Sequence, residues 1–282
     1  MKTFSEQIIK KSRLICKALL YLLCVIFFFL VNSIIYFLVP GKKNKLYLST
    51  KATTYIVRMS IFVLGVHVTV EDEKNFRAGK NFLAVSNHVS YLDIYSIASI
   101  MNSVFVASVD GVEKDLLMGT ATRLSGGLFV ERKNRSRVRE DMNTIKEVLD
   151  LGYNVVLFPE AGTSNGDRVL PFRSSLFESA INAKADVVTM SINYTGLNGE
   201  PVTKENRDNV YYYEHLQFFP HFFNLLEQKS VHSISNIFQK LSLIPAEAAK
   251  SFAVWPMMKF LLHLRKCRIY YHFSELFRFY CI

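Results

Sequence analysis

The sequence predicts an α/β fold in which a mostly parallel central sheet is flanked by helices. It also predicts an N-terminal transmembrane or membrane-embedded helix. Three observations support this prediction. Short apolar runs alternate with helical periodicity between residues 65 and 193, which is typical of a parallel sheet. Residues 18–39 are apolar and carry no charge. Half of the 282 residues are hydrophobic, which is enough to form a buried core.

Composition and charge narrow the possible classes of protein. Charged residues make up 21% of the chain and the mean hydropathy is +0.16, so a disordered chain and a many-pass membrane protein are both excluded. The 34 Lys and Arg outnumber the 24 Asp and Glu, which indicates an anionic partner such as nucleic acid, anionic lipid or a phosphorylated substrate. Four cysteines are too few for a disulfide framework. No Cys/His cluster has zinc-site spacing, so we expect no metal.

The first element is the apolar run at 18–39. A helix of this length, at about 1.5 Å per residue, crosses a hydrocarbon core of about 30 Å. A cleaved signal peptide has a shorter apolar region of about 7–15 residues that ends in small residues. This run instead ends at Pro40 and Gly41, followed by lysines, which indicates a retained anchor. Positive charges on both flanks leave its orientation open, and a hairpin that enters the membrane and returns is also possible.

A second helix is predicted at 46–65. Thr54 and Ile61 lie near one face, whereas Lys51 and Arg58 lie elsewhere. Two interpretations remain open: a helix at the membrane interface with its basic side chains toward phosphate headgroups, or an ordinary amphipathic surface helix.

The remaining elements alternate in type. A helix that begins at Ser136 and stops at Gly152 has apolar side chains at helical spacing. The predicted strands are 65–70, 81–86, 103–108, 127–131, 154–158 and 186–193, and the other helices are 91–101 and 174–184.

We expect three regions: residues 1–65 as membrane anchor and interfacial helix, residues 66–225 as the α/β domain, and residues 226–282 as a C-terminal region of uncertain structure. The pattern weakens after residue 200, where basic and aromatic residues interleave. Such interleaving can bind single-stranded nucleic acid, but beside a membrane anchor it favours packing at the lipid interface. We therefore expect membrane lipids as partners and no nucleic acid.

His88 and Asp93 fall at the predicted turn between the strand at 81–86 and the next helix. A histidine with a carboxylate partner can remove a proton from a hydroxyl. Five residues along an ideal helix leave two side chains about 140° apart, so His88 must precede the helix if it contacts Asp93. Asp93 also fits a capping box, so a purely structural role remains open.

Three ordered blocks point to a family. They are Asn87-His88 with Asp93, the run GLFVER at 127–132, and Phe158-Pro159-Glu160. Together they resemble the glycerolipid acyltransferase family, whose type members are bacterial 1-acyl-glycerol-3-phosphate acyltransferases. The resemblance covers roughly residues 60–225.

The resemblance implies an enzyme of phospholipid biosynthesis. It implies transfer of a fatty acyl chain from acyl-CoA or acyl-carrier protein to the free hydroxyl of a lysolipid. The expected acceptor is lysophosphatidate, with another lyso-phospholipid or a lyso-aminolipid as the alternative. A non-catalytic basic lipid-binding membrane protein is the alternative from a different class. The expected location is the bacterial inner membrane, with the active site on the cytoplasmic side.

The resemblance also implies catalytic roles. His88 is similar to the general base and Asp93 to its orienting partner, and neither a cofactor nor a metal is required.

For substrate binding the resemblance implies Arg132, Glu160, Gly162 and Thr163. Arg132 follows a strand and has the chemistry to bind a phosphate, or it belongs to a solvated charge run. Glu160 contacts the acceptor or, alternatively, orients the backbone of its turn. The third block departs from the family because Thr163 stands where arginine is usual, and Arg173 is a candidate to supply that charge. Gly162 and Gly166 permit positive φ and a close approach to the substrate.

Overall fold

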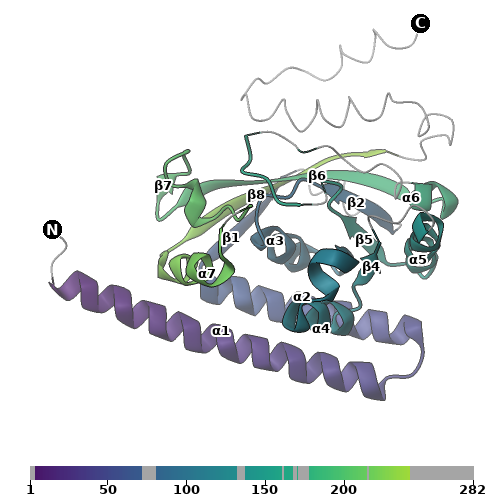
Figure 1. The fold of residues 1–282 in the computed structure, drawn as a ribbon, viewed down its shortest axis with the longest axis horizontal. Helices are drawn as coiled ribbons and strands as arrows, with labels where there is room; N and C mark the ends of the chain where they lie inside the picture. The colour runs from purple at the N-terminus through teal and green to yellow at the C-terminus, as the bar shows by residue number, and fades with distance from the viewer. Residues whose placement is uncertain are drawn as a thin grey trace, which may run out of the picture.

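The computed structural model describes residues 4–71, 81–131, 137–160, 162–167, 170, 178–214 and 216–241. A mixed sheet with the strand order β1-β8-β6-β2-β5-β3-β4 forms its centre, and β7 pairs with β6 outside this path. A long helical hairpin, α1–α2, runs along one side of the sheet, and α3, α4 and α7 lie on that same side (Figure 1).

The elements alternate along the chain as the sequence predicts. The strands are β1 Val66–Glu71, β2 Phe82–Ser86, β3 Ser103–Ser108, β4 Leu128–Val130, β5 Asn154–Leu157, β6 Asp186–Leu197, β7 Glu200–Pro201 and β8 Val231–Leu241. The helices are α1 Phe4–Leu38, α2 Lys42–Leu64, α3 Leu92–Ile100, α4 Leu116–Leu124, α5 Val138–Asp150, α6 Glu178–Asn182 and α7 Phe218–Glu227, with a π-helical turn η2 Val109–Glu113 and a 3₁₀ turn η5 Arg207–Asn209.

The predicted α/β class is confirmed. Strands β2 to β6 pair in parallel with one another, and only the contacts of β6 with β7 and β8 are antiparallel among the described strands. The predicted strands and the helices at 91–101 and 46–65 are all present. The predicted cap Ser136 lies outside the described residues, as does most of the first half of the helix expected at 174–184.

The elements that were not predicted include β7, β8, α4 and α7. Strand β8 pairs in parallel with β1 and antiparallel with β6, so the sheet continues past residue 225, where the sequence shows no clear pattern. Helix α4 was also missed, because it carries a glycine and exposes its first apolar side chains. The division of the chain at residues 65 and 225 stays a prediction.

The core lies on both faces of the sheet. Successive side chains of a strand point to opposite faces. Accordingly Phe82 and Ala84 pack with residues of α3 and α7, whereas Leu83 and Val85 pack with residues of α5. Strand β2 is therefore buried on both sides, as is usual for the central strand of a parallel sheet. This rigid central strand carries the candidate active site at its end.

The hairpin is tied to the sheet by polar contacts. Gly65 ends α2 at φ 75°, and a Cβ there would lie 2.6 Å from the carbonyl oxygen of Lys229. Lys17 Nζ of α1 donates to the carbonyls of Leu64 and Gln228 at 2.7 and 2.8 Å. By length and composition, α1 is the one described helix that could cross a membrane, over Ile8–Leu38.

Helix α2 contacts α3 through polar side chains, and both interpretations of this helix stay predictions. Arg58 Nε donates to the carbonyl oxygen of Ser99 at 2.7 Å, so this side chain turns toward α3. Thr54 is buried and donates to the carbonyl of Met101 at 3.4 Å.

Candidate active site

The candidate site is built where two neighbouring parallel strands end. His88 follows β2 and Glu160 follows β5, and these strands pair directly. Parallel strands present their carboxyl ends at one edge of a sheet, where α/β proteins bind ligands. Accordingly the backbone N–H of His88 donates to Glu160 Oε1 at 2.9 Å.

The structure brings His88 and Asp93 into contact. The distance from His88 Nδ1 to Asp93 Oδ2 is 2.8 Å. His88 lies in the turn and Asp93 in the first turn of α3, as the spacing required. The N–H groups of Val89 and Ser90 donate to the same oxygen at 2.7 and 2.9 Å. Asp93 therefore closes the turn and holds the imidazole at once, so both roles considered from the sequence coincide.

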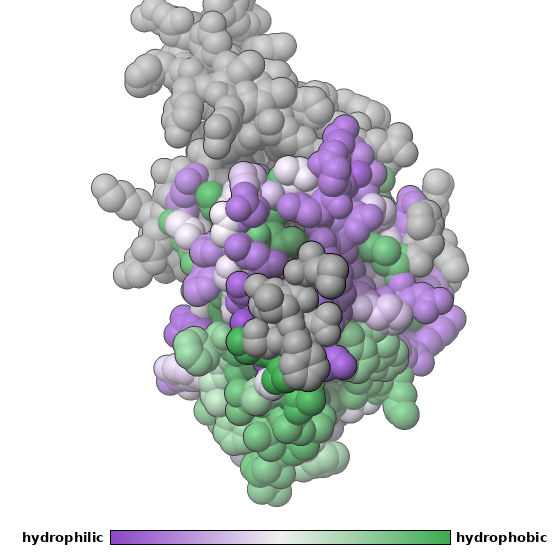
Figure 2. Space-filling model, turned by 90° about the vertical axis from the view of Figure 1, so that its left-hand side faces the viewer, coloured by the Kyte–Doolittle hydropathy of each residue, from purple (hydrophilic) through white to green (hydrophobic). Residues whose placement is uncertain are grey.

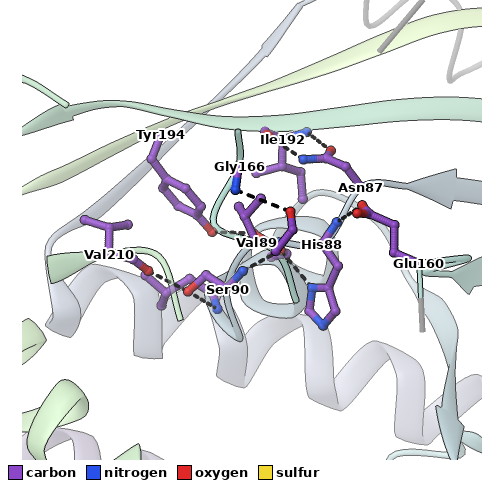
Figure 3. Close-up of polar contacts among 12 residues, drawn as sticks. Asn87, His88, Val89, Ser90, Glu160, Gly166, Ile192, Tyr194 and Val210 are labelled. Carbon is purple, nitrogen blue, oxygen red and sulfur yellow. Dashed lines mark hydrogen bonds and ion pairs between the residues drawn. The ribbon is translucent and has the colours of Figure 1, made fainter. Parts of the chain in front are cut away.

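Tyr194 of β6 is a member of the site that the sequence analysis missed. Its hydroxyl donates to Asp93 Oδ1 at 2.7 Å, and both side chains are fully buried (Figure 3). Burial and the Asp93 charge raise the pKa of Tyr194 well above its ordinary value, so it stays a neutral donor. The sequence could have indicated this residue, because a tyrosine on the inward face of a strand needs a hydrogen-bond partner for its buried hydroxyl.

The imidazole of His88 is fixed in orientation and remains accessible. It stacks on the ring of Phe158, with centroids 4.1 Å apart and planes at 15°. Its side chain is 16% exposed, and it projects away from Ile192 of β6 (Figure 3). No partner of Nε2 is found among the described residues. Because Nδ1 faces a carboxylate, the neutral ring carries its proton there and presents a lone pair at Nε2.

Other contacts hold the His88 turn against the sheet. The Asn87 amide donates to the carbonyl of Ile192 at 3.0 Å and accepts from its N–H at 2.8 Å, which continues the β2–β6 ladder by one step. Ser90 Oγ donates to the carbonyl of Val210 at 2.7 Å, and the Tyr212 N–H donates to the carbonyl of Val89 at 2.9 Å. The turn is therefore clamped from two sides.

Glu160 orients backbone, which is the alternative that the sequence left open. Its Oε1 accepts from His88 and its Oε2 from the N–H of Leu170 at 2.7 Å. Burial raises the pKa of this carboxyl, and the two N–H donors partly oppose that shift. Contact of Glu160 with a substrate stays a prediction.

The structure describes some of the other predicted binding residues and not others. Arg132 and Arg173 lie outside the described residues. Gly162 is exposed and does not have positive φ, whereas Gly166 does (φ 79°), and contact of Gly162 with a substrate stays a prediction. Thr163 is half-buried beside Ser164, whose N–H donates to the carbonyl of His88 at 2.9 Å. The third block therefore contacts the His88 backbone.

An ion pair that the sequence did not predict holds this loop. Arg207 of η5 donates through both terminal nitrogens to the two oxygens of Asp167, at 2.6 and 3.0 Å. Such bidentate geometry gives a well-defined orientation. A Cβ on Gly166 would lie 2.4 Å from the ring of Tyr211, so the loop packs directly on that ring.

The chain is similar in sequence to known acyltransferases. The model of the family described as Acyltransferase matches residues 67–193. A lyso-ornithine lipid O-acyltransferase of Rhizobium meliloti (strain 1021) is 33% identical over 178 residues, covering 61% of this chain and 60% of that protein. A 1-acyl-sn-glycerol-3-phosphate acyltransferase of Neisseria gonorrhoeae is 33% identical over 128 residues, covering 45% of this chain and 50% of that protein. The chain thus spans half to three-fifths of these relatives.

A solved structure shares the fold. The 1-acyl-sn-glycerophosphate acyltransferase of Thermotoga maritima matches with a TM-score of 0.55 and 18% identity, over 90% of this chain and all of that one.

Proposed function

We propose that this chain, whose residues 67–193 match the model of the Acyltransferase family, transfers a fatty acyl group from a thioester to the free hydroxyl of a lysolipid. The observation that carries the proposal is the His88–Asp93 pair at the carboxyl edge of the sheet, with Nδ1 bound and the imidazole accessible. A fixed imidazole backed by a buried carboxylate is the arrangement that general-base catalysis on an alcohol requires.

The proposed reaction needs no covalent enzyme intermediate. His88 Nε2 takes the proton of the acceptor hydroxyl as its oxygen attacks the thioester carbonyl carbon. The tetrahedral intermediate collapses, the C–S bond breaks, and the departing sulfur takes the proton from the imidazolium. Asp93 stabilises the imidazolium charge between these steps, and its four hydrogen bonds keep it in place.

Two acceptors are proposed, in order. Lysophosphatidate is the first, as in the family's type members, with acyl-CoA or acyl-carrier protein as donor. A lyso-aminolipid such as lyso-ornithine lipid is the second, and two observations favour it. Thr163 replaces the arginine usual in the third block. The aligned length is also greater for the lyso-ornithine relative than for the phosphate-acceptor relative at equal identity. We propose that Arg132, Gly162, Thr163 and Arg173 contact the acceptor.

We also propose that the protein acts at a membrane, with the site on the cytoplasmic side of the bacterial inner membrane. Helix α1 is long and apolar enough over Ile8–Leu38 to cross a membrane, and 6% of its most apolar window is buried in the protein. The acceptor and the product both reside in the bilayer. The net positive charge suits anionic headgroups and an anionic donor.

The deciding experiment measures thioester consumption by the full chain with lysophosphatidate and with lyso-ornithine lipid. His88→Ala is expected to lower kcat/KM by about 10²–10⁴-fold, because it removes the base. His232→Ala, an exposed histidine of β8, is the matched control and should retain activity. Unchanged turnover in His88→Ala, with a melting temperature like that of the wild type, contradicts the mechanism. Lipid binding without any lysolipid-dependent turnover supports a non-catalytic lipid-binding protein instead.

A further inference from the structure

Exposed large apolar side chains are confined to one side of the molecule. Among the described residues they lie on α1, α2, α4 and α7, with Ile94 of α3 as the single exception. These helices occupy the same side of the sheet (Figure 1). Figure 2 shows the resulting division, with an apolar lower part and a polar upper part. A soluble domain seldom gathers its exposed apolar surface in this way.

Helix α4 contributes a rigid apolar tip. Leu116 is 89% exposed, and Leu117 and Met118 beside it are also exposed. This turn is not frayed, because Asp115 Oδ1 accepts the N–H groups of Leu117 and Met118 at 3.0 and 2.7 Å. Lys114 stands next to the tip, and its exposed ammonium forms an ion pair with Asp110 at 3.3 Å. A capped helix end that presents leucines beside a lysine suits a lipid surface, because the ammonium reaches phosphate while the leucines enter hydrocarbon.

Helix α7 contributes a second apolar contact. Phe219, which is 68% exposed, and Phe223 are four residues apart and therefore share one face. The opposite face is anchored, since His221 Nε2 donates to the carbonyl of Tyr211 at 3.0 Å, His221 Nδ1 accepts from the Tyr91 hydroxyl at 3.0 Å, and Leu225 is buried. The ring of Phe222 packs on Tyr21 of α1 at 4.9 Å. The exposed phenylalanines thus continue the surface of the hairpin.

The hairpin itself presents a place for lipid chains. An apolar groove of about 800 Å³ runs between α1 and α2, lined by residues that include Leu20, Leu23, Phe27, Met59 and Phe62. The hairpin, the α4 tip and the α7 face form one continuous side with no described strand between them (Figure 1).

The α4 tip belongs to the same edge of the sheet as His88. Helix α4 follows the carboxyl end of β3 through η2, and His88 follows the carboxyl end of β2. Strand β5 pairs in parallel with both β2 and β3, so these ends meet at one edge. Aromatic contacts also connect β3 with His88, since the ring of Phe158 stacks on His88 and contacts Phe105 of β3.

We propose that the α4 tip (Leu116, Leu117 and Met118) and the outer face of α7 (Phe219 and Phe223) dock on the lipid bilayer beside the α1–α2 hairpin. The bilayer then meets the protein at the edge that carries His88, and a lysolipid reaches the imidazole without leaving the membrane. This proposal rests on the proposed membrane function and adds two contact sites to it. Continuity with α1, whose length and composition suit hydrocarbon, favours lipid over a protein partner.

The test places one tryptophan at each surface. The chain has a single tryptophan, Trp255, which is replaced by phenylalanine. Into this background go Leu117→Trp on α4, Phe219→Trp on α7, Leu22→Trp on α1 as the positive control, and Asn143→Trp on α5 as the negative control. Each full chain is reconstituted into phosphatidylcholine and phosphatidylglycerol vesicles with and without brominated acyl chains, and the emission is compared.

At positions 117 and 219 we expect a blue-shifted emission and quenching comparable with that at position 22. At position 143 we expect no quenching. Quenching at position 22 alone overturns the docking surface and leaves the proposed membrane function standing. No quenching at position 22 overturns membrane association itself. Blue-shifted emission at 117 or 219 without quenching shows that a second copy or another protein covers the surface, which also overturns the proposal.

A kinetic arm tests the consequence for substrate entry. The double variant Leu116→Ser and Leu117→Ser is expected to lower turnover of a long-chain lysolipid in vesicles severalfold. It should leave turnover of a short-chain, monomeric lysolipid unchanged, because neither leucine contacts the reacting groups. An equal loss on both substrates, or no loss on either, contradicts a docking role for the α4 tip.

Discussion

At the scale of single residues, Asp93 is held by four donors that come from two distant parts of the chain. Three of them, His88 Nδ1 and the N–H groups of Val89 and Ser90, meet Oδ2 and are local to the turn. The fourth, the Tyr194 hydroxyl, meets Oδ1 and lies 101 residues away. Without Tyr194, a buried carboxylate oxygen would lose its described donor. Tyr194 is therefore a positioning residue that acts through Asp93.

Tyr194→Phe tests this positioning role. Hydrogen bonds to charged groups contribute about 1.5–3 kcal/mol, so we expect a similar loss of unfolding free energy. We also expect kcat to fall while KM stays near the wild-type value, because the dyad is disordered and the acceptor site is not. Steady-state kinetics with a lysolipid acceptor, together with thermal unfolding, measure both effects.

Tyr211→Phe is the matched control. The Tyr211 ring packs against that of Tyr194, but its hydroxyl meets Asn193 at 3.4 Å rather than the carboxylate. A wild-type kcat in Tyr194→Phe, or an equal loss of kcat in both variants, argues against the role assigned to Tyr194.

Glu160 allows a prediction about pH. Burial raises the pKa of its carboxyl in the folded protein, so the group binds a proton more readily there than in the unfolded chain. Its contribution to stability is therefore present in full below the unfolded pKa and is lost as pH rises through the folded value.

Glu160→Gln removes that titration and leaves one of two backbone donors, His88 or Leu170, without an acceptor, at a cost of about 1–3 kcal/mol. We expect the variant to be less stable than the wild type at pH 5 and the gap to narrow at pH 8. Denaturant unfolding from pH 5 to pH 8 measures the difference in unfolding free energy between the wild type and the variant. A difference that stays constant or grows with pH contradicts a raised pKa for Glu160.

At the scale of elements, the loop at 162–167 offers a matched pair of glycines. Gly166 has φ 79° and its Cβ position lies 2.4 Å from the ring of Tyr211, whereas a Cβ on Gly162 meets nothing within 4 Å. An L-residue in the left-handed region costs about 1–2 kcal/mol before any clash. Gly166→Ala should therefore lower the free energy of unfolding by about 2 kcal/mol or more and reduce activity.

Gly162→Ala should leave stability within about 0.5 kcal/mol of the wild type, as surface changes usually do. Thermal unfolding of the two variants measures the loss of stability, and acyl transfer assays measure the loss of activity. A loss of activity in Gly162→Ala at unchanged stability supports substrate contact there. Equal stability of both variants contradicts the packing described for Gly166.

The elements also show what a sequence can predict. The apolar runs at 81–86 and 154–158 correctly predicted the buried strands 82–86 and 154–157, and the spacing of His88 and Asp93 correctly required a turn before the helix. Strand β8 and Tyr194 were missed because their positions depend on pairing and packing across long separations, which leave no local pattern. Helix α4 was missed because its exposed leucines do not follow the periodicity of a helix that packs on a core.

At the scale of the whole molecule, the exposed apolar side chains should contribute to membrane affinity and contribute little to the free energy of unfolding. Phe37 of α1 and Phe62 of α2 are 76% and 85% exposed. Replacing both by serine should change the free energy of unfolding little, because neither packs in the core. Full burial of a phenylalanine in an apolar medium is worth about 1.5–3 kcal/mol, so vesicle affinity should fall at least tenfold.

Vesicle flotation and thermal unfolding of the double variant measure these two quantities. Leu64→Ser, at a buried position of α2, is the contrasting control and should lower stability. A double variant that floats with vesicles like the wild type argues against lipid contact at these two positions.

The place of β8 in the sheet affects how the protein is made. Strand β1 pairs with β8 and follows directly on the hairpin, yet β8 lies more than 150 positions later in the chain. During translation the nascent hairpin and β1 must therefore leave the ribosome long before their partner strand is synthesised. Because β8 is the described strand that pairs with β1, the ladder of residues 66–71 cannot form until residues 231–236 have been synthesised. The complete strand order, with β8 between β1 and β6, can therefore form only after residues 231–241 have been synthesised.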